Sequence, residues 1–272
     1  MSLSFRKYQA LQNDYLLFDA LDAPLVFAPE AIVAMCHRRL GAGADGILIV
    51  SRAPDGAFRM EILNSDGSEA AMCGNGLRCV GKFLADSGRL APGTRAGVHT
   101  ASGPRHVTVL EHGTAVSRVV AGLGRPRVLD ASLRAGDLSF VHVDVGNPHI
   151  VHFLATDAPA AEAPAWIRRL ALSDGPELES LLPGGVNVGF AWPAAPDRLE
   201  LAVWERGAGF TQACGTGATA AVTAARLLGL VADSPVLVRQ AGGDATVTLD
   251  ADGSATLDGP AHFVFAGQWP SA

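Results

Sequence analysis

The 272-residue sequence lacks the features that mark an exported, membrane-bound or zinc-binding protein. Residues 1–19 contain no continuous apolar core of the kind that a signal peptide needs. No stretch reaches the roughly 18 uninterrupted apolar residues of a membrane-spanning helix. The four cysteines form no C-x-x-C pair, which argues against a structural zinc site. We therefore expect a cytoplasmic protein with free thiols, no bound metal and no membrane contact.

Lysine is scarce as well, since Lys7 and Lys82 are the only two in the chain. The formal net charge is −6 at pH 7. A protein that binds nucleic acid or an anionic membrane needs a basic surface, so we expect neither partner. A hydrophobic content of 49% and a charged content of 18% are instead typical of a globular chain. The length suits one large domain or two smaller ones.

Short β-like runs punctuated by Gly, Pro and Asp dominate the chain. They predict strands over 14–20, 46–52, 58–63, 105–111, 139–145, 150–154, 187–192, 199–205, 236–240 and 245–250. Helices are predicted over 29–40, 73–88, 164–172 and 215–229. Gly88 and Gly229 stand where helix-ending residues belong.

The order of these elements repeats in the two halves of the chain. Each half reads as strands, a helix introduced by Cys-Gly-x-Gly, and then further strands. The Pro/Gly/Arg-rich segment 121–137 is the expected crossover between them. We therefore predict an α+β fold of two pseudo-symmetric domains, each a β-rich sheet or barrel wrapped on a central helix.

The two Cys-Gly-x-Gly motifs begin at Cys73 and Cys214. A thiol at the start of a helix is near the positive end of the helix dipole and near free amides, which favour the thiolate. The glycines let a carboxylate approach the N–H groups. Two such groups, one thiolate and one thiol, can remove a proton from one face of a carbon and return one to the other. The pair predicts inversion of a stereocentre, while the alternative is two core cysteines packed beside glycines.

Three other patterns in the sequence do not indicate a functional site. Residues 215–220 fit G-x-G-x-x-A, but a dinucleotide site also needs a βαβ unit and an acidic residue at a strand end. Asp233 has the right spacing but lies in a predicted turn, so we expect no nucleotide site. Cys36 and Cys79 are interpreted as core residues. The histidines show no metal-ligand spacing with the cysteines, and His142 and His152 are interpreted as structural strand positions.

Over nearly its whole length the chain resembles the diaminopimelate epimerase family. The matching stretches are KYQALQNDYLLFD, GAGADGILIV, NSDGSEAAMCGNGLRCVGKF, VGNPHIV, GVNVGFA, WERGAGFTQACGTGATAAV and the tail GGDATV…GPAHFVF. The resemblance implies an isomerase that interconverts LL- and meso-diaminopimelate by a two-base thiol/thiolate mechanism without a cofactor. It implies two domains, 1–118 plus about 260–272 and 119–259, with the active site in the cleft between them. It also implies that the binding partner is a small-molecule amino-acid substrate, and it is compatible with a homodimer.

The resemblance assigns a role to each matching residue. Cys73 and Cys214 are the catalytic thiols, and His149 lies beside them. Backbone amides at Gly74, Asn75, Gly215 and Thr216 are assigned to the carboxylate of the reacting centre, and Asn13 to the substrate pocket. Asn64, Asn147, Asn187 and Arg206 are assigned to the carboxylate at the far end, where the planar guanidinium suits such a group. Glu205 is assigned to the distal ammonium.

Two departures from the family pattern concern the fit of the substrate. The usual H-G-L-G-N-D-F reads QALQNDY here, so that Gln12 replaces a glycine. Phe210 replaces a glutamate four positions before Cys214. Two alternatives therefore stay open: a racemase or epimerase of a different amino acid on the same scaffold, and a catalytically inactive amino-acid-binding module.

Overall fold

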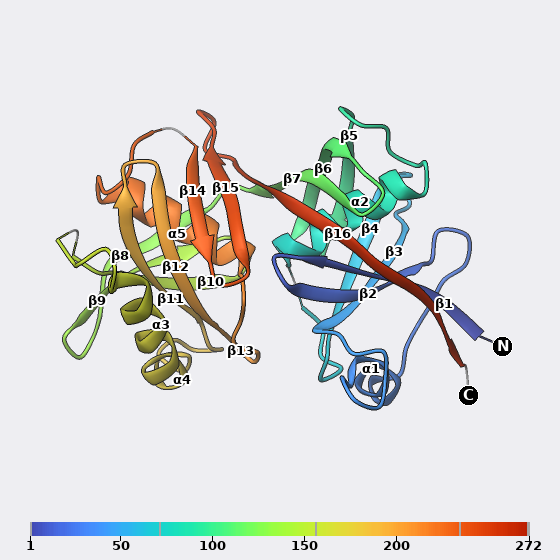
Figure 1. Ribbon diagram of the computed structural model, residues 1–272, viewed down its shortest axis with the longest axis horizontal. Coiled ribbons are helices and arrows are strands. Elements are labelled where there is room, and N and C mark those ends of the chain that lie inside the picture. Colours follow the sequence, from blue (N-terminus) through green and yellow to red (C-terminus); the bar gives the residue numbers. More distant parts are fainter. Residues whose placement is uncertain (1, 71, 156, 234, 271–272) are drawn as a thin grey trace. The chain divides into compact units, whose positions relative to one another are not determined.

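The computed structural model describes residues 2–70, 72–155, 157–233 and 235–270. The chain divides into two compact units (Figure 1). Unit 1 comprises Met1–Gly122 and Gly259–Ala272, and unit 2 comprises Leu123–Asp258. The domains expected from the sequence, 1–118 plus about 260–272 and 119–259, stay a prediction. Among the helices in the described ranges, none has the length and apolarity to cross a membrane.

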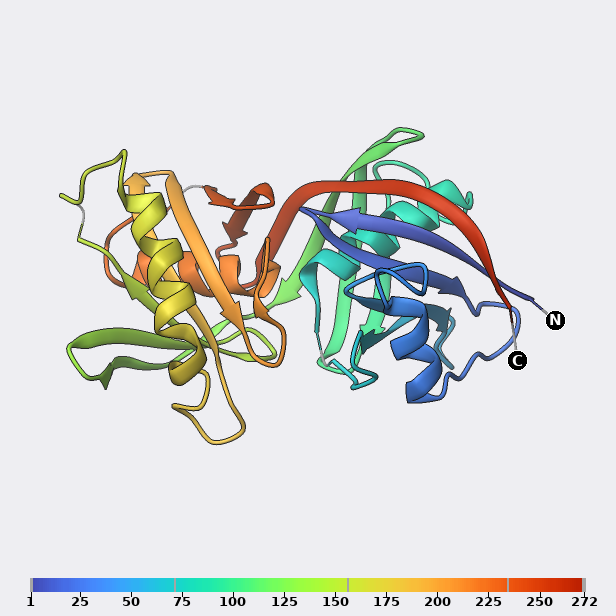
Figure 2. The same cartoon turned by 60° about the horizontal axis from the view of Figure 1, so that its bottom comes forward.

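Unit 1 is a ring of strands around one helix. Its strands are β1 (Ser2–Ala10), β2 (Asn13–Asp19), β3 (Gly46–Arg52), β4 (Phe58–Asn64), β5 (Arg95–Thr100), β6 (Gly103–His112), β7 (Val116–Gly124) and the later part of β16 (Ala255–Pro270). They are hydrogen-bonded in that order, and β16 pairs with both β7 and β1, which closes the ring. The central helix is α2 (Gly74–Asp86), which lies against these strands in two views (Figures 1 and 2). All its residues from Gly74 to Ala85 are buried.

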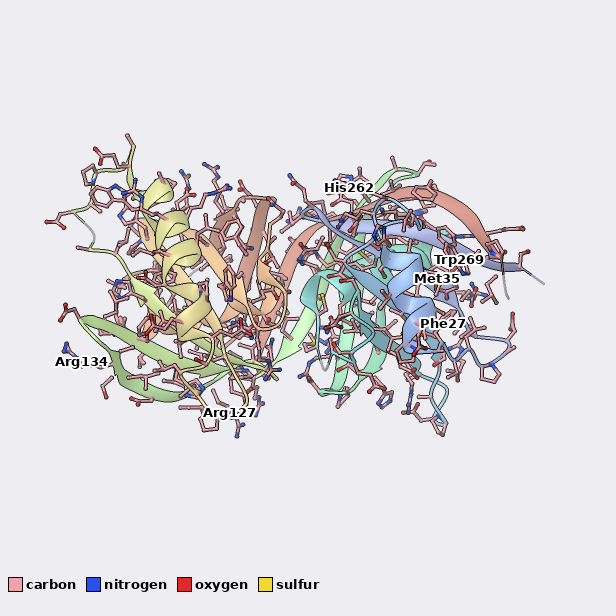
Figure 3. All side chains as sticks on the ribbon, turned by 90° about the horizontal axis from the view of Figure 1, so that it is seen from below. Phe27, Met35, Arg127, Arg134, His262 and Trp269 are labelled. Atoms are coloured by element: carbon pink, nitrogen blue, oxygen red, sulfur yellow. The ribbon has the colours of Figure 1, made fainter. Side chains whose placement is uncertain are left out.

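Unit 2 repeats this plan. Its strands are β8 (Arg127–Ala135), β9 (Leu138–Asp144), β10 (Pro148–Phe153), β11 (Asn187–Ala195), β12 (Arg198–Glu205), β14 (Val236–Gln240), β15 (Gly243–Leu249) and the start of β16. The short β13 (Gly209–Phe210) pairs with β12. The central helix is α5 (Gly215–Leu227). β8 is the last strand in the order, and Arg127 and Arg134 on it (Figure 3) are charges that disfavour edge pairing with another chain.

The strand directions repeat as well. In unit 1, β2 and β3 are parallel and are flanked by antiparallel partners β1 and β4. In unit 2, β10 and β11 are parallel and are flanked by antiparallel partners β9 and β12. The expected α+β fold with two similar halves is confirmed.

The outer face of each sheet is covered by further helices. In unit 1, Met35 of α1 (Pro29–Cys36) packs with Ile47 and Ile49 of β3, and Phe27 beside the helix joins them (Figure 3). In unit 2, Ile167 of α3 (Ala163–Ser173) packs with Phe190 of β11, and α4 (Gly175–Leu178) follows α3. Burial on both faces explains why β3 reads as a continuous apolar run.

The two central helices also end alike. Gly88 and Gly229 have φ of +69° and +68°. After α2, the N–H groups of Gly88 and Arg89 donate to Ala85 and Leu84. After α5, those of Gly229 and Leu230 donate to Arg226 and Ala225. Both are Schellman motifs, which need a left-handed residue and therefore favour glycine. The two predicted helix ends are confirmed.

Some elements differ from the sequence predictions. The helix expected over 29–40 ends at Cys36, because the carbonyls of Met35 and Cys36 accept hydrogen bonds from Gly43 and Ala44 in the returning chain. The segment 121–137, expected as a crossover, contains the end of β7 and all of β8. The strands β1, β5, β7, β8 and β16 and the helix α4 were not among the predicted elements. Few residues of β5 and β8 are buried, whereas β7 and the first half of β16 do alternate between buried and more exposed positions, an alternation that the prediction overlooked.

Candidate active site

Cys73 and Cys214 are the N-cap residues of α2 and α5. The Sγ atom of Cys73 accepts a hydrogen bond from the Gly76 N–H at 3.2 Å. The Sγ atom of Cys214 accepts one from the Gly217 N–H at 3.3 Å. Both sulfurs therefore lie where unpaired amides and the helix dipole favour negative charge. The repeated motif gives the same local structure in both units.

The second glycine of each motif makes room for the sulfur. A Cβ atom at Gly76 would lie 3.5 Å from Cys73 Sγ. A Cβ atom at Gly217 would lie 3.2 Å from Cys214 Sγ and 3.1 Å from Val203 Cγ2. Any side chain at Gly217 would therefore crowd the thiol against β12. At Gly76 the tighter neighbour is Leu48 Cδ2, at 3.2 Å from such a Cβ, so the close approach to the sulfur explains the glycine at 217 and packing on β3 the one at 76.

Cys73 is half-buried and has a tyrosine beside it. The Tyr15 hydroxyl oxygen, at the start of β2, lies 2.9 Å from Cys73 Sγ. Burial raises the pKa of Tyr15 well above its ordinary value, and the charge of Cys73 adds to the effect. Tyr15 therefore keeps its proton when the neighbouring sulfur ionises.

The other assigned residues of unit 1 lie on strands beside the start of α2. Tyr15 pairs with Gly46, which pairs with Asn64, so the three form one row across β2, β3 and β4. Asn13 is buried two residues before Tyr15, and alternation along a strand places both on one face. The Asn64 amide donates to Ser68 Oγ at 2.9 Å.

The first turn of α2 is held by a buried arginine. Arg78, which is fully buried, donates to Asn75 Oδ1 at 2.7 Å and to the Pro260 carbonyl at 3.4 Å. The Asn75 side chain is thereby fixed beside Gly74, whose backbone amide belongs to the same turn. The amides assigned to the reacting carboxylate are held in place on this side.

Cys214 has a different environment from Cys73. It is only 3% exposed, and its backbone N–H donates to Gln240 Oε1 at 2.8 Å. Burial raises the pKa of the Cys214 thiol well above its ordinary value, and the charge of Glu205 raises it further. Hydrogen bonds from Thr216 and the Gly217 amide act in the opposite direction but are smaller. The environment of Cys214 favours the protonated thiol.

His149 is connected to Cys214 through Thr216. Its Nε2 atom lies 3.0 Å from Thr216 Oγ1 and 3.1 Å from Asn147 Oδ1. The Asn147 amide also donates to Thr216 Oγ1 at 3.3 Å, and that hydroxyl lies 3.5 Å from Cys214 Sγ. Burial lowers the pKa of His149 to about 3, so the imidazole is neutral at physiological pH.

Asn187 connects the strand ends around this cluster. Its Nδ2 donates to the Pro148 carbonyl at 2.8 Å, and its Oδ1 accepts from the Arg206 N–H at 3.1 Å. The Arg206 side chain is exposed and donates to the Gly184 carbonyl at 2.8 Å. Glu205 accepts a hydrogen bond from Thr211 Oγ1 at 2.5 Å. The unit 2 residues assigned from the family lie at the ends of β10, β11 and β12 and at the start of α5: Asn147, His149, Asn187, Glu205, Arg206, Gly215 and Thr216.

Two residues at the thiols were not singled out from the sequence. For Tyr15 a signal existed, because Asn13-Asp14-Tyr15 and Asn147-Pro148-His149 occupy corresponding places in the repeat. Tyr15 pairs with Gly46 and His149 pairs with Asn187, each the first residue of the next, parallel strand. For Gln240 no signal existed, since it lies 26 positions from Cys214 in the sequence.

The two departures from the family pattern have structural explanations. Leu11 and Gln12 have φ of 52° and 67° in the β1–β2 turn, a left-handed conformation for which glycine is the usual residue. Phe210 packs into the core beneath α3, and the Arg168 Cζ lies 5.1 Å from its ring centroid. The apolar side chain at position 210 therefore stabilises the loop before Cys214 through α3.

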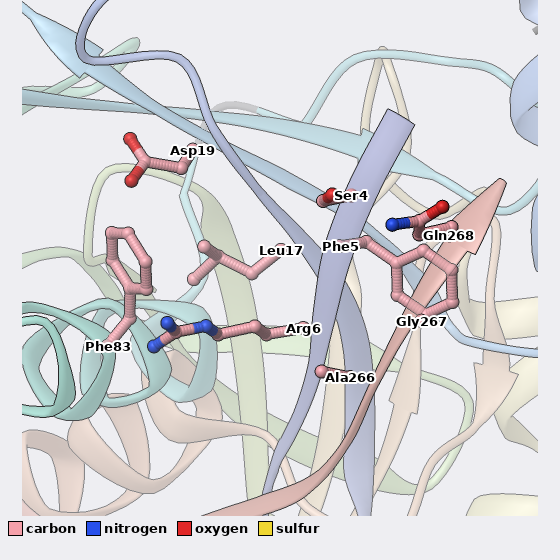
Figure 4. Close-up of a pocket in the computed structure, with 9 residues that line it drawn as sticks. All are labelled: Ser4, Phe5, Arg6, Leu17, Asp19, Phe83, Ala266, Gly267 and Gln268. Atoms are coloured by element: carbon pink, nitrogen blue, oxygen red, sulfur yellow. The ribbon is translucent and has the colours of Figure 1, made fainter. Parts of the chain in front are cut away.

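Away from these residues, unit 1 has a cavity of about 460 Å³ between β1, β2, β16 and the end of α2 (Figure 4). Arg6, Asp19 and Phe83 contribute to its walls, and the Arg6 Cζ lies 5.9 Å from the Phe83 ring centroid. Phe83 is near the opposite end of α2 from Cys73, roughly 15 Å along the helix axis. The cavity contains none of the residues assigned from the family. Within the described ranges, no group of three or more His, Cys, Asp or Glu side chains is placed to hold a metal ion.

Comparison with known proteins adds independent information. The family profile described as diaminopimelate epimerase matches residues 5–129 and 141–264. A diaminopimelate epimerase of Synechococcus elongatus is 38% identical over 98% of this chain and 98% of its own length. One of Bacteroides thetaiotaomicron is 34% identical over 98% and 97%. Among solved structures, a hydroxyproline epimerase from Agrobacterium vitis has a TM-score of 0.76 at 17% identity, covering 98% of this chain and 92% of that one, which shows a shared fold.

Proposed function

The chain belongs to the diaminopimelate epimerase family, and on that basis we propose that it interconverts LL- and meso-diaminopimelate with Cys73 and Cys214 as its acid/base pair. The observation that carries the proposal is the matched pair of thiols, each an N-cap residue whose sulfur accepts the amide of the second motif glycine. A core cysteine has no need of such a position, whereas a thiol that alternates between acid and base gains from it.

The proposed reaction balances with two thiols and needs no cofactor. The thiolate sulfur takes the α-proton, so the C–H bond breaks, an S–H bond forms and the electron pair stays on the carbon. The second thiol then gives its proton to the opposite face, so its S–H bond breaks and a new C–H bond forms. After one turnover the two sulfurs have exchanged protonation states, which prepares the enzyme for the reverse reaction.

The negative charge that develops next to the substrate carboxylate needs a partner. We assign this role to the first-turn amides of the two helices, at Gly74, Asn75, Gly215 and Thr216. These amides lie at the positive ends of the helix dipoles and are fixed before the reaction begins. The buried contacts of Asn75 with Arg78 and of Thr216 with His149 support this assignment, because they restrict both turns.

The far end of the substrate carries a second amino-acid head group. Arg206 is exposed and offers its guanidinium to the distal carboxylate, and Glu205 offers a charge to the distal ammonium. Asn64, Asn147 and Asn187 supply neutral donors and acceptors, and Asn13 completes the pocket. We further propose that the enzyme acts in the cytoplasm, where its thiols stay reduced, and as a homodimer, which light scattering of the purified protein tests directly.

Proton NMR of the reduced protein in D2O tests the proposal. LL-diaminopimelate is the main substrate, and lysine, ornithine, glutamate and histidine are run in parallel. We expect deuterium at the α-carbon of diaminopimelate, together with the meso product. Exchange with another amino acid alone would replace the substrate assignment, and no exchange in any sample would favour a binding module.

Cysteine variants test whether the two thiols themselves are needed for catalysis. Cys73→Ser and Cys214→Ser should each reduce epimerisation by about 10²- to 10⁴-fold, the usual contribution of an acid/base group. Cys36→Ala is the matched control, because Cys36 is buried at the end of α1 and burial raises its pKa to about 11. Full activity in either serine variant would refute the two-thiol mechanism.

A further inference from the structure

The two tyrosines of the chain contact opposite ends of α2. Tyr8 and Tyr15 are directly opposite each other in the β1–β2 pair, and both side chains are buried. The Tyr8 hydroxyl donates to Asp86 Oδ2 at 2.9 Å, at the last residue of the helix. The Tyr15 hydroxyl lies 2.9 Å from Sγ of Cys73, the N-cap residue at the other end. Neither role is explained by packing alone, since phenylalanine would fill the same space.

The direction of the Tyr15–Cys73 hydrogen bond follows from the protonation states. A thiolate has no proton to give, so the tyrosine O–H must be the donor when Cys73 is ionised. Because burial keeps Tyr15 protonated, this donor is present across the working pH range. A hydrogen bond to a charged acceptor is stronger than one to its neutral form, so the contact favours the thiolate over the thiol.

The hydroxyl beside Cys214 is that of Thr216, which is farther from the sulfur, at 3.5 Å, and comes from the same helix turn. The repeat counterpart of Tyr15 is His149, which contacts Thr216 Oγ1 rather than the sulfur. The Glu205 carboxylate acts on Cys214 in the opposite sense and favours the thiol. The two halves therefore have the same backbone geometry but unequal electrostatics.

We propose that Tyr15 is a positioning residue for Cys73, whose hydroxyl holds the sulfur at the start of α2 and stabilises it as the thiolate, so that the substrate-free enzyme carries its proton on Cys214. The catalytic consequence rests on the proposed function, whereas the state of each thiol is measurable without turnover.

Several charged or titratable groups surround the pair, and their ion pairs do not include Tyr15. Asp14 contacts Lys7 at 2.7 Å, and Asp45 contacts Arg38 at 2.6 Å. Burial alone would raise the pKa of Asp14, but Arg38 and Lys7 outweigh it and lower the value. The titratable groups that act on Tyr15 are Cys73, Cys79 and Asp45. Arg78 and Asp14 act on Cys79, and Lys7 and Arg38 act on Asp14. A Tyr15→Phe substitution removes the hydroxyl and leaves these groups in place.

The test is the pH dependence of iodoacetamide alkylation, resolved by mass spectrometry into the Cys73 and Cys214 peptides. In the wild-type protein, Cys73 should react with its midpoint at a lower pH than Cys214. In Tyr15→Phe, the midpoint of Cys73 alkylation should rise by about one pH unit. At any pH below that midpoint, the thiolate fraction of Cys73 would then be about tenfold lower than in the wild type. The midpoint of Cys214 alkylation should not change. Tyr8→Phe is the matched control, since it removes the other buried hydroxyl of the same strand pair, and it should leave both midpoints unchanged.

Kinetics provide a second readout on the same variants. For Tyr15→Phe, kcat/KM below the acidic midpoint should fall about tenfold and by the same factor in both directions, because the equilibrium between the isomers is fixed. At higher pH the variant should approach the wild-type rate, which a general loss of packing would not allow. The proposal is overturned if Cys214 ionises before Cys73, if Tyr15→Phe leaves the Cys73 midpoint unchanged, or if Tyr8→Phe moves it equally. If the alkylation midpoints are as expected but the wild-type protein does not epimerise diaminopimelate, only the proposed function is contradicted.

Discussion

Cys73 and Cys214 have the same N-cap geometry but different neighbours. Cys73 is half-buried with the Tyr15 hydroxyl 2.9 Å from its sulfur. Cys214 is buried, and burial together with Glu205 raises the pKa of its thiol. At the scale of the residue, the backbone gives each sulfur the same amides, and the side chains brought by other strands determine which sulfur holds the proton.

Buried His149 predicts how stability depends on pH. Burial lowers its pKa in the folded protein to about 3, from 6.5 in the unfolded chain. The unfolded state therefore binds a proton below about pH 6.5 that the folded state excludes. The stability that His149 contributes is present above pH 6.5 and is lost as pH falls toward 3, at about 1.4 kcal/mol per pH unit.

Urea unfolding between pH 7 and pH 4 measures this effect. The wild-type free energy of unfolding should decline across the range. His149→Asn, which keeps a polar group but does not titrate, should show a shallower decline. His142→Asn is the control, since His142 is half-buried in β9. Equal slopes in His149→Asn and the wild type would show that this histidine does not set the dependence.

At the scale of the element, α2 and α5 are built by the same rules at both ends. Each has a thiol N-cap, a glycine that makes room for the sulfur and a Schellman glycine after the last turn. These positions have separate tasks, because the second glycine of the motif lies against the sulfur and the glycine after the last turn only ends the helix. Substitutions in α5 can therefore distinguish catalysis from stability.

Gly217→Ala and Gly229→Ala form such a pair. A Cβ at Gly217 would press on Cys214 Sγ and Val203, so we expect turnover to fall at least about tenfold, through loss of sulfur alignment. A Cβ at Gly229 meets nothing within 4 Å, but φ is +68°, so the substitution costs about 1 kcal/mol of stability. Thermal melting and turnover of both variants are the measurements. A Gly229→Ala enzyme with reduced turnover but normal stability would contradict this separation.

At the scale of the whole molecule, one strand belongs to both units. β16 pairs with β15 in unit 2 through Ala255–Asp258 and with β1 in unit 1 through residues 262–270. The ring around α2 is therefore closed by a segment that follows all of unit 2 in the sequence. Until β16 is in place, β1 and β7 are exposed edges.

Removal of residues 259–272 should expose those edges. We expect amide hydrogen exchange to accelerate strongly in β1 and β7, because each loses a pairing partner. The β10–β11 pair of unit 2 is the internal control and should keep its protection. Protected β1 amides in the shortened chain would mean that the ring is stable without its closing strand.

Sequence reasoning predicted the α+β fold of two similar halves, which is confirmed, and the two cysteines at helix starts. The buried strands, such as β3, were predicted because apolar residues line both of their faces. The central helices were predicted because the motif, the glycine and the apolar periodicity are all local signals. β5 and β8 were missed because few of their residues are buried, whereas the alternation in β7 and in the first half of β16 was present and overlooked. The crossover predicted at 121–137 does contain the boundary between the units, at Gly122 and Leu123, but most of the segment is strand, since proline and glycine there flank β8 rather than interrupt it.

By itself the sequence determined the two thiols, their place at helix starts and the family, because these depend on residues adjacent in the chain. Only the tertiary structure decided that Tyr15 meets Cys73, that Gln240 holds the Cys214 amide and that Glu205 acts on its thiol. Gln240 is 26 and Tyr15 58 positions from the thiol that it contacts. Contacts over such separations depend on strand order and register, which bring distant side chains together without leaving a local pattern.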